Sequence, residues 1–508
     1  MQHTQILTLS AVVGSISIAS GFAQTKASDE QRPMNVLFIV SDDMRTDLGV
    51  YGHPTVKTPN LNKLANEGVR FERAYCQYPL SCPSRSSLLT GRRPATSGLY
   101  SNREWFGATY PDWVSLPKLF KQNRYVALRT GKIFHGGIDD TDAWTEGGEA
   151  RLFTNPINTA PPSYINPSDH YSFQRRIPKL TPGADPSSRR TDPLGNPDSD
   201  NWEAVEGEVA KQLGDTRVGD KAIEYIRRSK ETGQPFFIAC GFSKPHTPFI
   251  APKEFFDLYS IDDIELPPDF ASLPMIPPGF PEGSIRPNNA DLFIGRTASP
   301  EEARQMILAY YACISYVDWN VGRVIAELDR QGLRENTIII FWSDHGFQLG
   351  EKGKWSKAGS LWEQGTRVPF IIHDPRVKGN GVSSPRIVEL VDIYPTLVEL
   401  CGLPKQKGLD GASLTPLLEN PLTEWNRPAY TVWNEHGRGI TGVAIRTERW
   451  RYAEFFGIGA GAFLTDPIND PHELRNLVYD PKYKDIVAEL HKLASEHVAG
   501  KTELPPPK

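Results

Sequence analysis

The run Asn35-Val-Leu-Phe-Ile-Val-Ser41 is apolar and β-branched, and it ends in the acidic pair Asp42-Asp43. A short apolar run of this kind is typical of a strand that is buried on both faces of a parallel sheet. Polar residues directly after such a strand lie at its carboxyl end, where open α/β sheets place their ligand-binding groups. This stretch therefore predicts both a fold class and the place of a functional site.

Similar runs recur along the chain and alternate with helical patterns. Phe236 to Gly241 and Thr337 to Trp342 are typical of further buried strands, and apolar residues at helical spacing predict a long helix from Glu301 to Gln331. Helical spacing also extends over Leu61 to Phe71 and over Val388 to Leu400. We therefore expect an α/β fold with a large, mostly parallel sheet sandwiched by helices.

Two kinds of region depart from this alternation. The stretches Gly136 to Asn201 and Leu266 to Pro300 are rich in Pro, Gly, Asp and Ser, and we interpret them as long ordered loops of a substrate pocket. From about Trp425 onward the pattern changes to short runs that predict a smaller antiparallel sheet with a closing helix. These runs are Ala429 to Trp433, Gly442 to Ile445, Trp450 to Phe455 and the helical Lys482 to Val498.

The N-terminus has the pattern of an export signal. An apolar stretch from Ile6 to Ile18 is followed by small residues around Gly21-Phe22-Ala23, which predicts a signal peptide over residues 1–23 and a periplasmic or secreted protein. The residues before the apolar stretch include no Lys or Arg, so the alternative is a disordered or buried N-terminal tail. No later segment reaches the roughly 18 continuous apolar residues of a membrane span. The expected domains are a catalytic domain over residues 24–424 and a C-terminal subdomain over residues 425–508.

Composition excludes several classes of protein. The 508 residues include 56 Lys and Arg against 61 Asp and Glu, and the formal net charge is -5. This balance gives no electrostatic reason to expect a nucleic acid or an anionic membrane as partner. Five scattered cysteines, an odd count, are not a disulfide framework and form no Cys-x-x-Cys metal motif.

Acidic residues follow two of the predicted strands. Asp42-Asp43 follows the first, and Asp344-His345 follows the strand that ends at Trp342. In a parallel sheet these strand ends lie at the same edge, so three carboxylates and an imidazole can converge on one cation. Each pair alone has an equally good interpretation as a helix cap or a loop acid. Together, the two pairs favour a metal site.

The segment Ser81-Cys82-Pro83-Ser84-Arg85-Ser86-Ser87-Leu88-Leu89-Thr90-Gly91-Arg92 resembles the signature of type I, formylglycine-dependent sulfatases of the alkaline phosphatase superfamily. In that signature Cys or Ser precedes x-Pro-Ser-Arg, three further residues and Leu-Thr-Gly-Arg. The resemblance runs from about Asn35 to Leu403 and is closest to iduronate-2-sulfatases and related polysaccharide sulfatases. It implies the alkaline phosphatase fold and a sulfuric ester hydrolase.

The register of the signature decides which residue is the nucleophile. Counting back from Pro83 and Arg85 places Ser81 at the modified position and Cys82 at the variable one. The resemblance thus implies that a separate maturation enzyme of the serine type oxidises Ser81 to formylglycine, whose hydrate attacks sulfur, while Arg85 holds the hydrate and neutralises the metal ligands. Pro83 suits a first helical turn, which leaves Ser81 at the positive end of the helix dipole. We interpret Cys82 as a buried bystander thiol.

Further segments match the family in chain order, and the resemblance assigns their residues roles. Lys132 and Lys357 are the implied sulfate-binding cations. His135 is the implied base, and His246 the implied general acid, which also contacts the substrate, because a sugar alkoxide is a poor leaving group. Taken singly, each of these has a bland interpretation as a surface lysine or a structural histidine. The matching segments are Gly131 to His135, Lys244 to Phe249, Ser343 to Glu351 and Trp355 to Lys357.

The resemblance implies one divalent cation, taken to be Ca²⁺. Its implied ligands are Asp42, Asp43, Ser81, Asp344 and His345. The histidine is unusual for calcium, which prefers oxygen ligands, but near relatives share it.

Aromatic and basic residues in loops are candidates for binding an anionic sugar, although ordinary loop packing explains them equally well. These candidates are Asn102, Arg103, Trp105, Trp433, His436 and Arg438.

The leading hypothesis is an enzyme that hydrolyses a sulfate ester, with 2-O-sulfate favoured, on a uronate- or pentose-containing polysaccharide or oligosaccharide. One alternative is a phosphatase or phosphodiesterase of the same superfamily that uses unmodified Ser81 between two metals. Such relatives add an Asp-x-x-x-His pair, whereas this chain has Asp318 and Gly322 at that spacing. The other alternative is an inactive, carbohydrate-binding relative.

Overall fold

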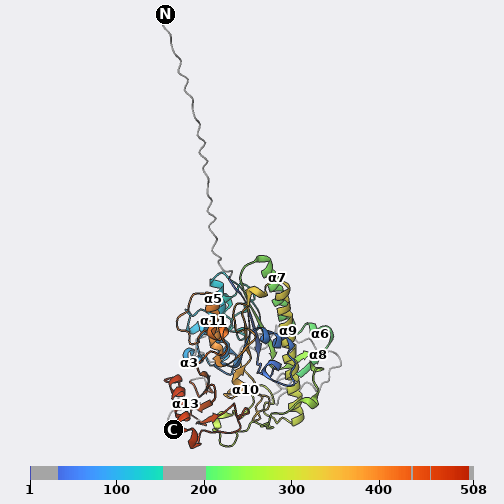
Figure 1. Cartoon of the computed structure of the whole chain (residues 1–508). Coiled ribbons are helices and arrows are strands. Elements are labelled where there is room, and N and C mark those ends of the chain that lie inside the picture. Colours follow the sequence, from blue (N-terminus) through green and yellow to red (C-terminus); the bar gives the residue numbers. More distant parts are fainter. Residues whose placement is uncertain (2–32, 153–201, 436–438, 458, 503–508) are drawn as a thin grey trace. The chain divides into compact units, whose positions relative to one another are not determined.

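The computed structural model describes Met1 and residues 33–152, 202–435, 439–457 and 459–502. The fold lies in the unit Met34–Lys508 (Figure 1). The expected signal peptide, apart from Met1, and most of the expected loop from Gly136 to Asn201 lie outside the described residues, as do His436 and Arg438. Among the described helices, none is both long enough and apolar enough to cross a membrane.

An eight-stranded sheet forms the centre of this unit. Its strands are β1 (Asn35–Asp42), β2 (Val69–Tyr75), β3 (Val126–Gly131), β5 (Phe236–Pro245), β7 (Thr337–Ser343), β8 (Arg367–Val368), β9 (Phe370–His373) and β10 (Ser383–Glu389). They follow the order β10, β2, β9, β7, β1, β5, β3, and β8 pairs with β2 beside this path. β7, β1, β5 and β3 are mutually parallel, as are β10 and β2, whereas β9 is antiparallel to both neighbours. The expected mostly parallel sheet is confirmed.

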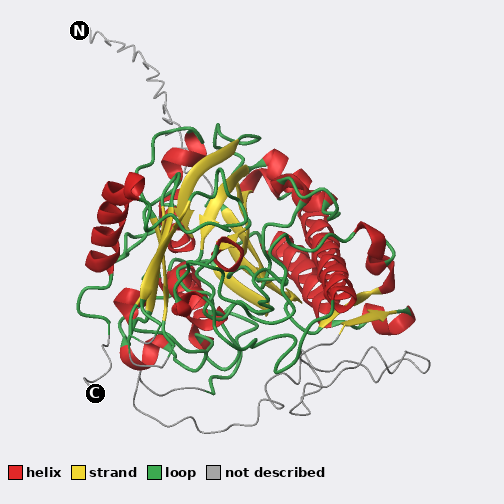
Figure 2. Ribbon diagram, turned by 90° about the horizontal axis from the view of Figure 1, so that it is seen from below, coloured by secondary structure: helices red, strands yellow, loops and turns green. Residues whose placement is uncertain are grey.

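The two faces of the sheet are both buried. Leu37 and Ile39 of β1 belong to one apolar core together with α1 (Pro59–Glu67), α7 (Gly214–Thr232) and α9 (Pro300–Arg330). Figure 2 shows helices on both sides of the strands. The alternate residues of β1 pack on the opposite side, against helices α2 (Ser81–Thr90), α5 (Leu116–Gln122) and α11 (Ile393–Leu400).

The strand registers bring the polar segments to one edge of the sheet. Ser41 of β1 lies opposite Ser343 of β7, and Gly131 of β3 lies opposite Gly241 of β5. The chain segments that follow these parallel strands therefore leave the sheet side by side. This is the edge at which the acidic pairs were expected to meet.

Two expected helices are wrong in part. The helix expected over Leu61 to Phe71 ends at Glu67, and Val69–Tyr75 is strand β2. The helix expected over Val388 to Leu400 begins only at Ile393, since Ser383–Glu389 is strand β10 and a short turn follows it. In both cases a helix and a strand follow each other closely in the chain. Their few apolar residues fit the spacing of a helix as well as that of a strand, so the pattern did not separate the two elements.

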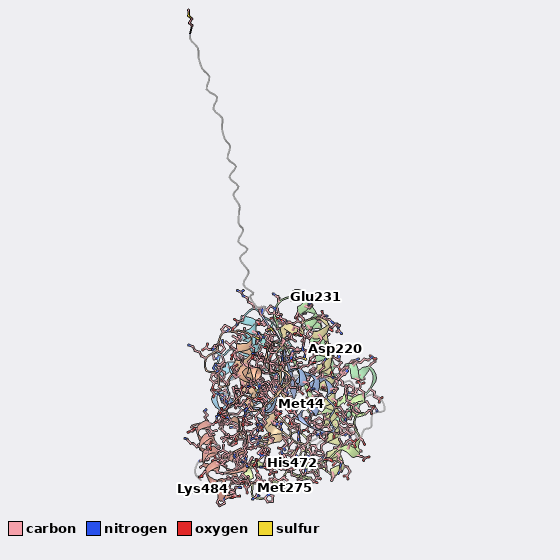
Figure 3. The ribbon with its side chains drawn as sticks, viewed as in Figure 1. Met44, Asp220, Glu231, Met275, His472 and Lys484 are labelled. Atoms are coloured by element: carbon pink, nitrogen blue, oxygen red, sulfur yellow. The ribbon has the colours of Figure 1, made fainter. Side chains whose placement is uncertain are left out.

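A four-stranded antiparallel sheet forms the C-terminal region, as expected. Its strands are β11 (Ala429–Trp433), β12 (Gly442–Arg446), β13 (Arg451–Phe455) and β14 (Gly461–Thr465), and helix α13 (Lys484–His497) packs on them. Met275 and His472 lie close together in Figure 3, and backbone groups of both residues bond to Lys352. The long loop before α9 thus meets the C-terminal region.

The remaining described elements are short. They are η1 (Gly49–Tyr51), α3 (Pro94–Ser97), α4 (Phe106–Thr109), η2 (Thr141–Ala143), β4 (Trp202–Val205), α6 (Gly207–Lys211), β6 (Phe249–Pro252), α8 (Lys253–Phe256), η5 (Ile261–Asp263), η6 (Glu282–Ser284), η7 (Arg334–Asn336), α10 (Glu363–Thr366), η8 (Leu390–Asp392), α12 (Thr415–Glu419) and η9 (Pro481–Tyr483).

Candidate active site

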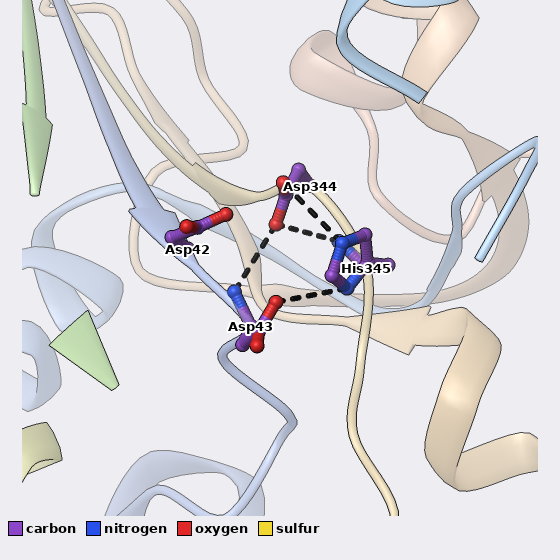
Figure 4. Close-up of side chains that lie close together, drawn as sticks. All are labelled: Asp42, Asp43, Asp344 and His345. Carbon is purple, nitrogen blue, oxygen red and sulfur yellow. Dashed lines mark hydrogen bonds and ion pairs between the residues drawn. The ribbon is translucent and has the colours of Figure 1, made fainter. Parts of the chain in front are cut away.

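Asp42, Asp43, Asp344 and His345 form a buried cluster at the carboxyl ends of β1 and β7 (Figure 4). One ligand atom from each residue lies within 4.8 Å of the others. The backbone N–H of Asp43 donates to Asp344 Oδ1 at 3.1 Å, and Asp43 Oδ1 lies 3.4 Å from His345 Nδ1. Asp43 has φ of 64°, a left-handed conformation that few residues other than glycine adopt and that is often found at functional sites. The convergence expected from the sequence is present.

The donor atoms of this cluster fit a divalent cation. Asp43 Oδ1 is buried and makes no hydrogen bond within the described part of the chain, which is costly for a carboxylate oxygen unless a ligand satisfies it. His345 Nδ1 lies 3.0 Å from the carbonyl oxygen of Gly346, so Nδ1 carries the proton and Nε2 offers its lone pair. A histidine that binds a metal is ordinarily oriented in this way.

Ser81 lies beside this cluster, at the first residue of helix α2. Its Oγ is 3.2 Å from Asp42 Oδ1 and 3.1 Å from His345 Nε2. The N–H of the next residue, Cys82, donates to Asn102 Oδ1 at 3.0 Å. The hydroxyl is therefore in reach of the same cation that the carboxylates would hold.

Arg85, one turn further along α2, is fully buried beneath the cluster. Its Nε donates to Asp344 Oδ2 at 2.8 Å, and its Nη2 donates to Asp42 Oδ1 at 3.0 Å. Burial alone would raise the pKa of Asp42, but the charges of Lys132 and Arg85 hold it well below its usual range. Arg85 thus helps to keep Asp42 ionised and joins carboxylates at the ends of two different strands.

Lys132 leaves the end of β3 and ion-pairs with Asp42 Oδ2. Its position depends on two glycines: a Cβ on Gly131, which has φ of 71°, would lie 2.0 Å from the carbonyl oxygen of Gly241, and a Cβ on Gly241 would lie 2.0 Å from that of Lys132. The strands can approach this closely only without side chains. His135, three residues later, is neutral at pH 7, because burial and then Lys132 bring its pKa well below its usual range, and its buried Nδ1 makes no hydrogen bond to described residues.

His246 lies after β5, on a loop that Asp215 of helix α7 supports. The backbone N–H groups of Ser243 and Lys244 donate to the two oxygens of Asp215, both at 2.9 Å. His246 Nδ1 lies 2.6 Å from the carbonyl oxygen of Thr247, so Nδ1 carries the proton and Nε2 faces the cluster, 4.0 Å from Asp43 Oδ2. Burial and the charge of Lys357 lower the pKa of His246.

Lys357 completes the site through its contact with Asp43. Its Nζ donates to Asp43 Oδ2 at 2.8 Å and to Asp291 Oδ1 at 2.9 Å. Burial alone would lower the pKa of Lys357, but Asp291 and Asp43 raise it above its ordinary value, so the ammonium stays charged. Asp291 was not predicted, because it lies in a loop without periodicity and its partner is 66 residues away in the chain.

Comparisons with known proteins show which family the chain resembles. A family model described as "Sulfatase" matches residues 34–403, and one described as "N-sulphoglucosamine sulphohydrolase, C-terminal" matches residues 350–499. The human protein named iduronate 2-sulfatase is 32% identical over 436 residues, which cover 78% of this chain and 74% of that protein.

This chain belongs to the sulfatase family.

A protein of Formosa agariphila named sulfatase is also 32% identical, over 474 residues that cover 90% of this sulfatase and 86% of the relative. Among solved structures, a phosphonate monoester hydrolase of Agrobacterium radiobacter has a TM-score of 0.69 at 25% identity, covering 94% of this chain and 98% of that one. The resemblance to sulfatases of the alkaline phosphatase superfamily, close to the iduronate-2-sulfatase-like enzymes, is confirmed, and the protein is a sulfuric ester hydrolase.

The thiol of Cys82 is buried in this sulfatase and is not a reactive group. Its Sγ contacts Ser86 Oγ and the carbonyl oxygen of Glu104, and burial raises its pKa to about 12. A thiol with so high a pKa is almost entirely protonated at neutral pH and is a poor nucleophile.

The described candidates for sugar binding lie between α3 and α4 and at the end of strand β11, and the structure gives some of them other contacts. Asn102 accepts from the backbone of α2, as described above. Trp105 stacks under Arg151, whose guanidinium lies 3.6 Å from the ring centre, and Arg103 is exposed. Trp433 packs on Tyr78 and donates through Nε1 to Glu435 Oε2 at 2.7 Å.

The net charge of the described site can be balanced by one divalent cation together with one anion. Four carboxylates face three cations, which leaves one excess negative charge. A divalent cation would turn this excess into one positive charge, which a sulfate monoester anion neutralises. The carboxylates are those of Asp42, Asp43, Asp291 and Asp344, and the cations are Arg85, Lys132 and Lys357.

Proposed function

We propose that this sulfatase hydrolyses a sulfate ester, most favourably a 2-O-sulfate, on a uronate- or pentose-containing polysaccharide or oligosaccharide. The observation that carries the proposal is the position of Ser81: its Oγ lies within 3.2 Å of Asp42 and His345. The name of the human relative, iduronate 2-sulfatase, supports both the class of sugar and the position of the sulfate.

We further propose that Ser81 is oxidised to formylglycine by a separate serine-type maturation enzyme. Plain serine is a weak nucleophile toward sulfur, whereas the hydrated aldehyde supplies an attacking oxygen and a second oxygen that permits release of sulfate. Arg85 lies one helical turn away and would hold Asp42 and Asp344 in place by hydrogen bonds during this chemistry. The modification makes Ser81 the functional centre of α2.

The cation of this proposal is one Ca²⁺ held by Asp42, Asp43, the modified Ser81, Asp344 and His345. When bound, such an ion polarises the oxygens that approach it and offsets the negative charge that develops on the sulfuryl group. The unpartnered Oδ1 of Asp43 and the inward Nε2 of His345 support this ligand set.

The two lysines have the places of sulfate-binding groups. Lys132 contacts the cluster through Asp42, and Lys357 contacts it through Asp43. Their ammonium groups can hold the sulfuryl oxygens by charge-assisted hydrogen bonds in a site that largely excludes water. His135, neutral and with an unpartnered buried nitrogen, can accept the proton whose removal releases sulfate.

His246 is the proposed acid for the departing sugar oxygen. A neutral ring with its proton on Nδ1 cannot donate from Nε2, so donation requires the imidazolium form. The pKa of His246 is lowered in the absence of substrate, and the negative charge of a bound sulfate ester favours its protonation. The acid therefore becomes available when the ester binds.

The same geometry disfavours the phosphatase alternative. The ammonium of Lys357 lies between Asp43 and Asp291, near His246, where a second metal would otherwise find three ligands. Asp318, the remaining acid of the incomplete Asp-x-x-x-His pair, caps helix α1 by accepting from the backbone of Asn60 and Leu61. Asp318 therefore has a structural function.

We also propose that the protein is exported by a signal peptide over residues 1–23 and acts in the periplasm or outside the cell. Its catalytic domain would then comprise residues 24–424 and its C-terminal subdomain residues 425–508.

The proposal is tested by turnover of a defined panel. Protein from a host with a serine-type maturation enzyme is offered 4-nitrophenyl sulfate, 4-nitrophenyl phosphate, and uronate disaccharides with a 2-O-sulfate, each beside an isomer sulfated elsewhere. We expect turnover of the sulfates, with the 2-O-sulfated uronate preferred. Faster turnover of the phosphate would contradict the proposal and support a phosphatase. Binding of the saccharides without turnover would support an inactive, carbohydrate-binding relative.

A further inference from the structure

Two chain segments run side by side along one wall of the active site. The first, residues 286–293, comes from the long loop before α9, and the second, residues 353–357, carries Lys357. Asn289 Oδ1 accepts from the N–H of Trp355 at 2.9 Å, and the N–H of Leu292 donates to the carbonyl oxygen of Trp355 at 3.2 Å. The side chains of Phe293 and Trp355 also pack together, with ring centres 4.9 Å apart.

Asp291 is the residue of the first segment that reaches the cluster. Its Oδ1 accepts from Lys357 Nζ at 2.9 Å, and its Oδ2 accepts from Ser356 Oγ at 2.8 Å. Its carboxylate also lies within 4.8 Å of the ligand atoms of Asp43 and His246. Both oxygens are thus engaged by the segment that carries Lys357.

An ammonium group has three N–H donors, and its tetrahedral shape fixes the third direction once two are engaged. Within the described chain, Lys357 Nζ donates to Asp43 Oδ2 and Asp291 Oδ1, and no other acceptor is in reach. With Asp43 alone, the ammonium could swing about a single hydrogen bond. With both carboxylates, one N–H remains and has a defined direction.

We propose that Asp291 is the positioning residue for Lys357, and that its carboxylate directs the free N–H of that ammonium toward the sulfate group of the substrate. The inference rests on the proposed function of the site. Asp291 itself does not touch the reacting atoms; it acts through Lys357. An acidic residue beside an anion site repels the ligand unless it is neutralised, and the direct pairing with Lys357 provides that neutralisation.

The chain offers a matched control for this proposal. Asp269, in the same long loop, accepts from Lys352 Nζ at 2.7 Å, so it joins the same two loops through the same pair of residue types. Lys352 has no contact with Asp43 or Ser81 within the described residues. If loop docking were the whole function of Asp291, Asp269→Ala and Asp291→Ala would have similar effects.

The experiment measures kcat and KM for 4-nitrophenyl sulfate with the wild type, Asp291→Asn, Asp291→Ala, Lys357→Ala, the double variant Asp291→Ala/Lys357→Ala, and Asp269→Ala. We expect Asp291→Ala to lower kcat/KM about 10- to 100-fold, the size of a charge-assisted hydrogen bond. Asn retains the acceptor oxygen, so Asp291→Asn should lose about fivefold or less. In the double variant the loss should stay within about twofold of Lys357→Ala, because a residue that acts through Lys357 has nothing left to position.

A binding measurement separates this inference from the proposed function. Calorimetry of inorganic sulfate with the Ser81→Ala protein, in millimolar Ca²⁺, should show affinity about tenfold weaker when Asp291→Ala is added and unchanged when Asp269→Ala is added. Absence of any sulfate ester turnover by the wild type would overturn the proposed function, whereas the calorimetry still decides on Asp291. Additive losses in the double variant, or equal effects of Asp291→Asn and Asp291→Ala, would overturn the positioning role.

Discussion

Arg85 and Arg451 are both fully buried, and each lies between two carboxylates, yet their surroundings differ. Arg85 joins Asp42 and Asp344 at the active-site edge of the large sheet. Arg451, on β13 of the small sheet, forms ion pairs with Glu363 of α10 and with Glu473. These pairs connect the small sheet to α10, the helix that follows the segment with Lys357.

The difference lies in whether the protein itself satisfies the charges. Burial alone would raise the pKa of Glu363, but Arg451, Arg446 and Arg367 together hold it below its usual range. Around Arg85 a carboxylate oxygen, Asp43 Oδ1, makes no hydrogen bond to described residues. Arg451 Nε also makes no hydrogen bond to described residues, but it lies 3.1 Å from its ion-pair partner Glu473 Oε1, whereas Asp43 belongs to the cluster of potential metal ligands. A cation bound to that cluster would satisfy the free oxygen of Asp43.

The largest expected effect is a loss of activity without a loss of stability, at the network around Arg85. Ser81→Ala should lower kcat for 4-nitrophenyl sulfate by a factor of about 10⁴ or more, since the nucleophile is lost. The melting temperature should stay within a degree or two, because the small hydroxyl contributes little to packing. Residual turnover near the wild-type rate would mean that another group attacks sulfur.

Removing each arginine tests the comparison directly. Arg85→Met and Arg451→Met should each lower the free energy of unfolding by about 3–5 kcal/mol, because each leaves two buried carboxylates without their partner. In the folded fraction, Arg451→Met should keep nearly the wild-type kcat, whereas Arg85→Met should lose most activity. Urea unfolding followed by assays at low denaturant measures both quantities. Equal losses of kcat would erase the distinction between the two networks.

His246 gives the active-site network a dependence on pH that the Arg451 network lacks. A general acid must be protonated, so kcat/KM for a sugar sulfate should fall as pH rises through the pKa of His246, which burial and Lys357 place below its ordinary value of about 6.5. His246→Gln should remove this decline and lower the rate about 10³-fold. With 4-nitrophenyl sulfate, whose leaving group needs no proton, the loss should be under about tenfold. Equal losses on both substrates would assign His246 another role.

A smaller effect comes from adding the cation. Ca²⁺ at 100 times its dissociation constant should stabilise the folded protein by about 2.7 kcal/mol, seen as a rise in melting temperature. Asp43→Asn should abolish that rise, and Glu473→Gln, which disturbs only the Arg451 network, should preserve it. A rise that survives Asp43→Asn would place the ion elsewhere.

The sequence was sufficient to predict the parts of the site that are local in the chain. Asp42, Asp43, Asp344 and His345 directly follow buried strands, and parallel strands must bring their carboxyl ends together, so their convergence follows from pattern alone. Ser81 and Arg85 lie in one short motif on a single helix. Each of these residues is placed by the element that carries it.

Long-range contacts were not predictable in this way. Asp291 meets Lys357 because two irregular segments pair through side chains, and no period in the sequence records that pairing. Strands β2 and β10 were missed because each directly adjoins a helix and has too few apolar residues to separate the two periods. The contact of Asn102 with the start of α2 likewise depends on loop geometry.

Mass spectrometry of the peptide that contains Ser81, from protein made in a host with a serine-type maturation enzyme, is the most direct test of the proposed chemistry. Our account predicts that active protein carries an aldehyde at this position, two hydrogen atoms lighter than serine, and that turnover rises in proportion to the converted fraction. Full turnover by protein with intact serine at position 81 would contradict it.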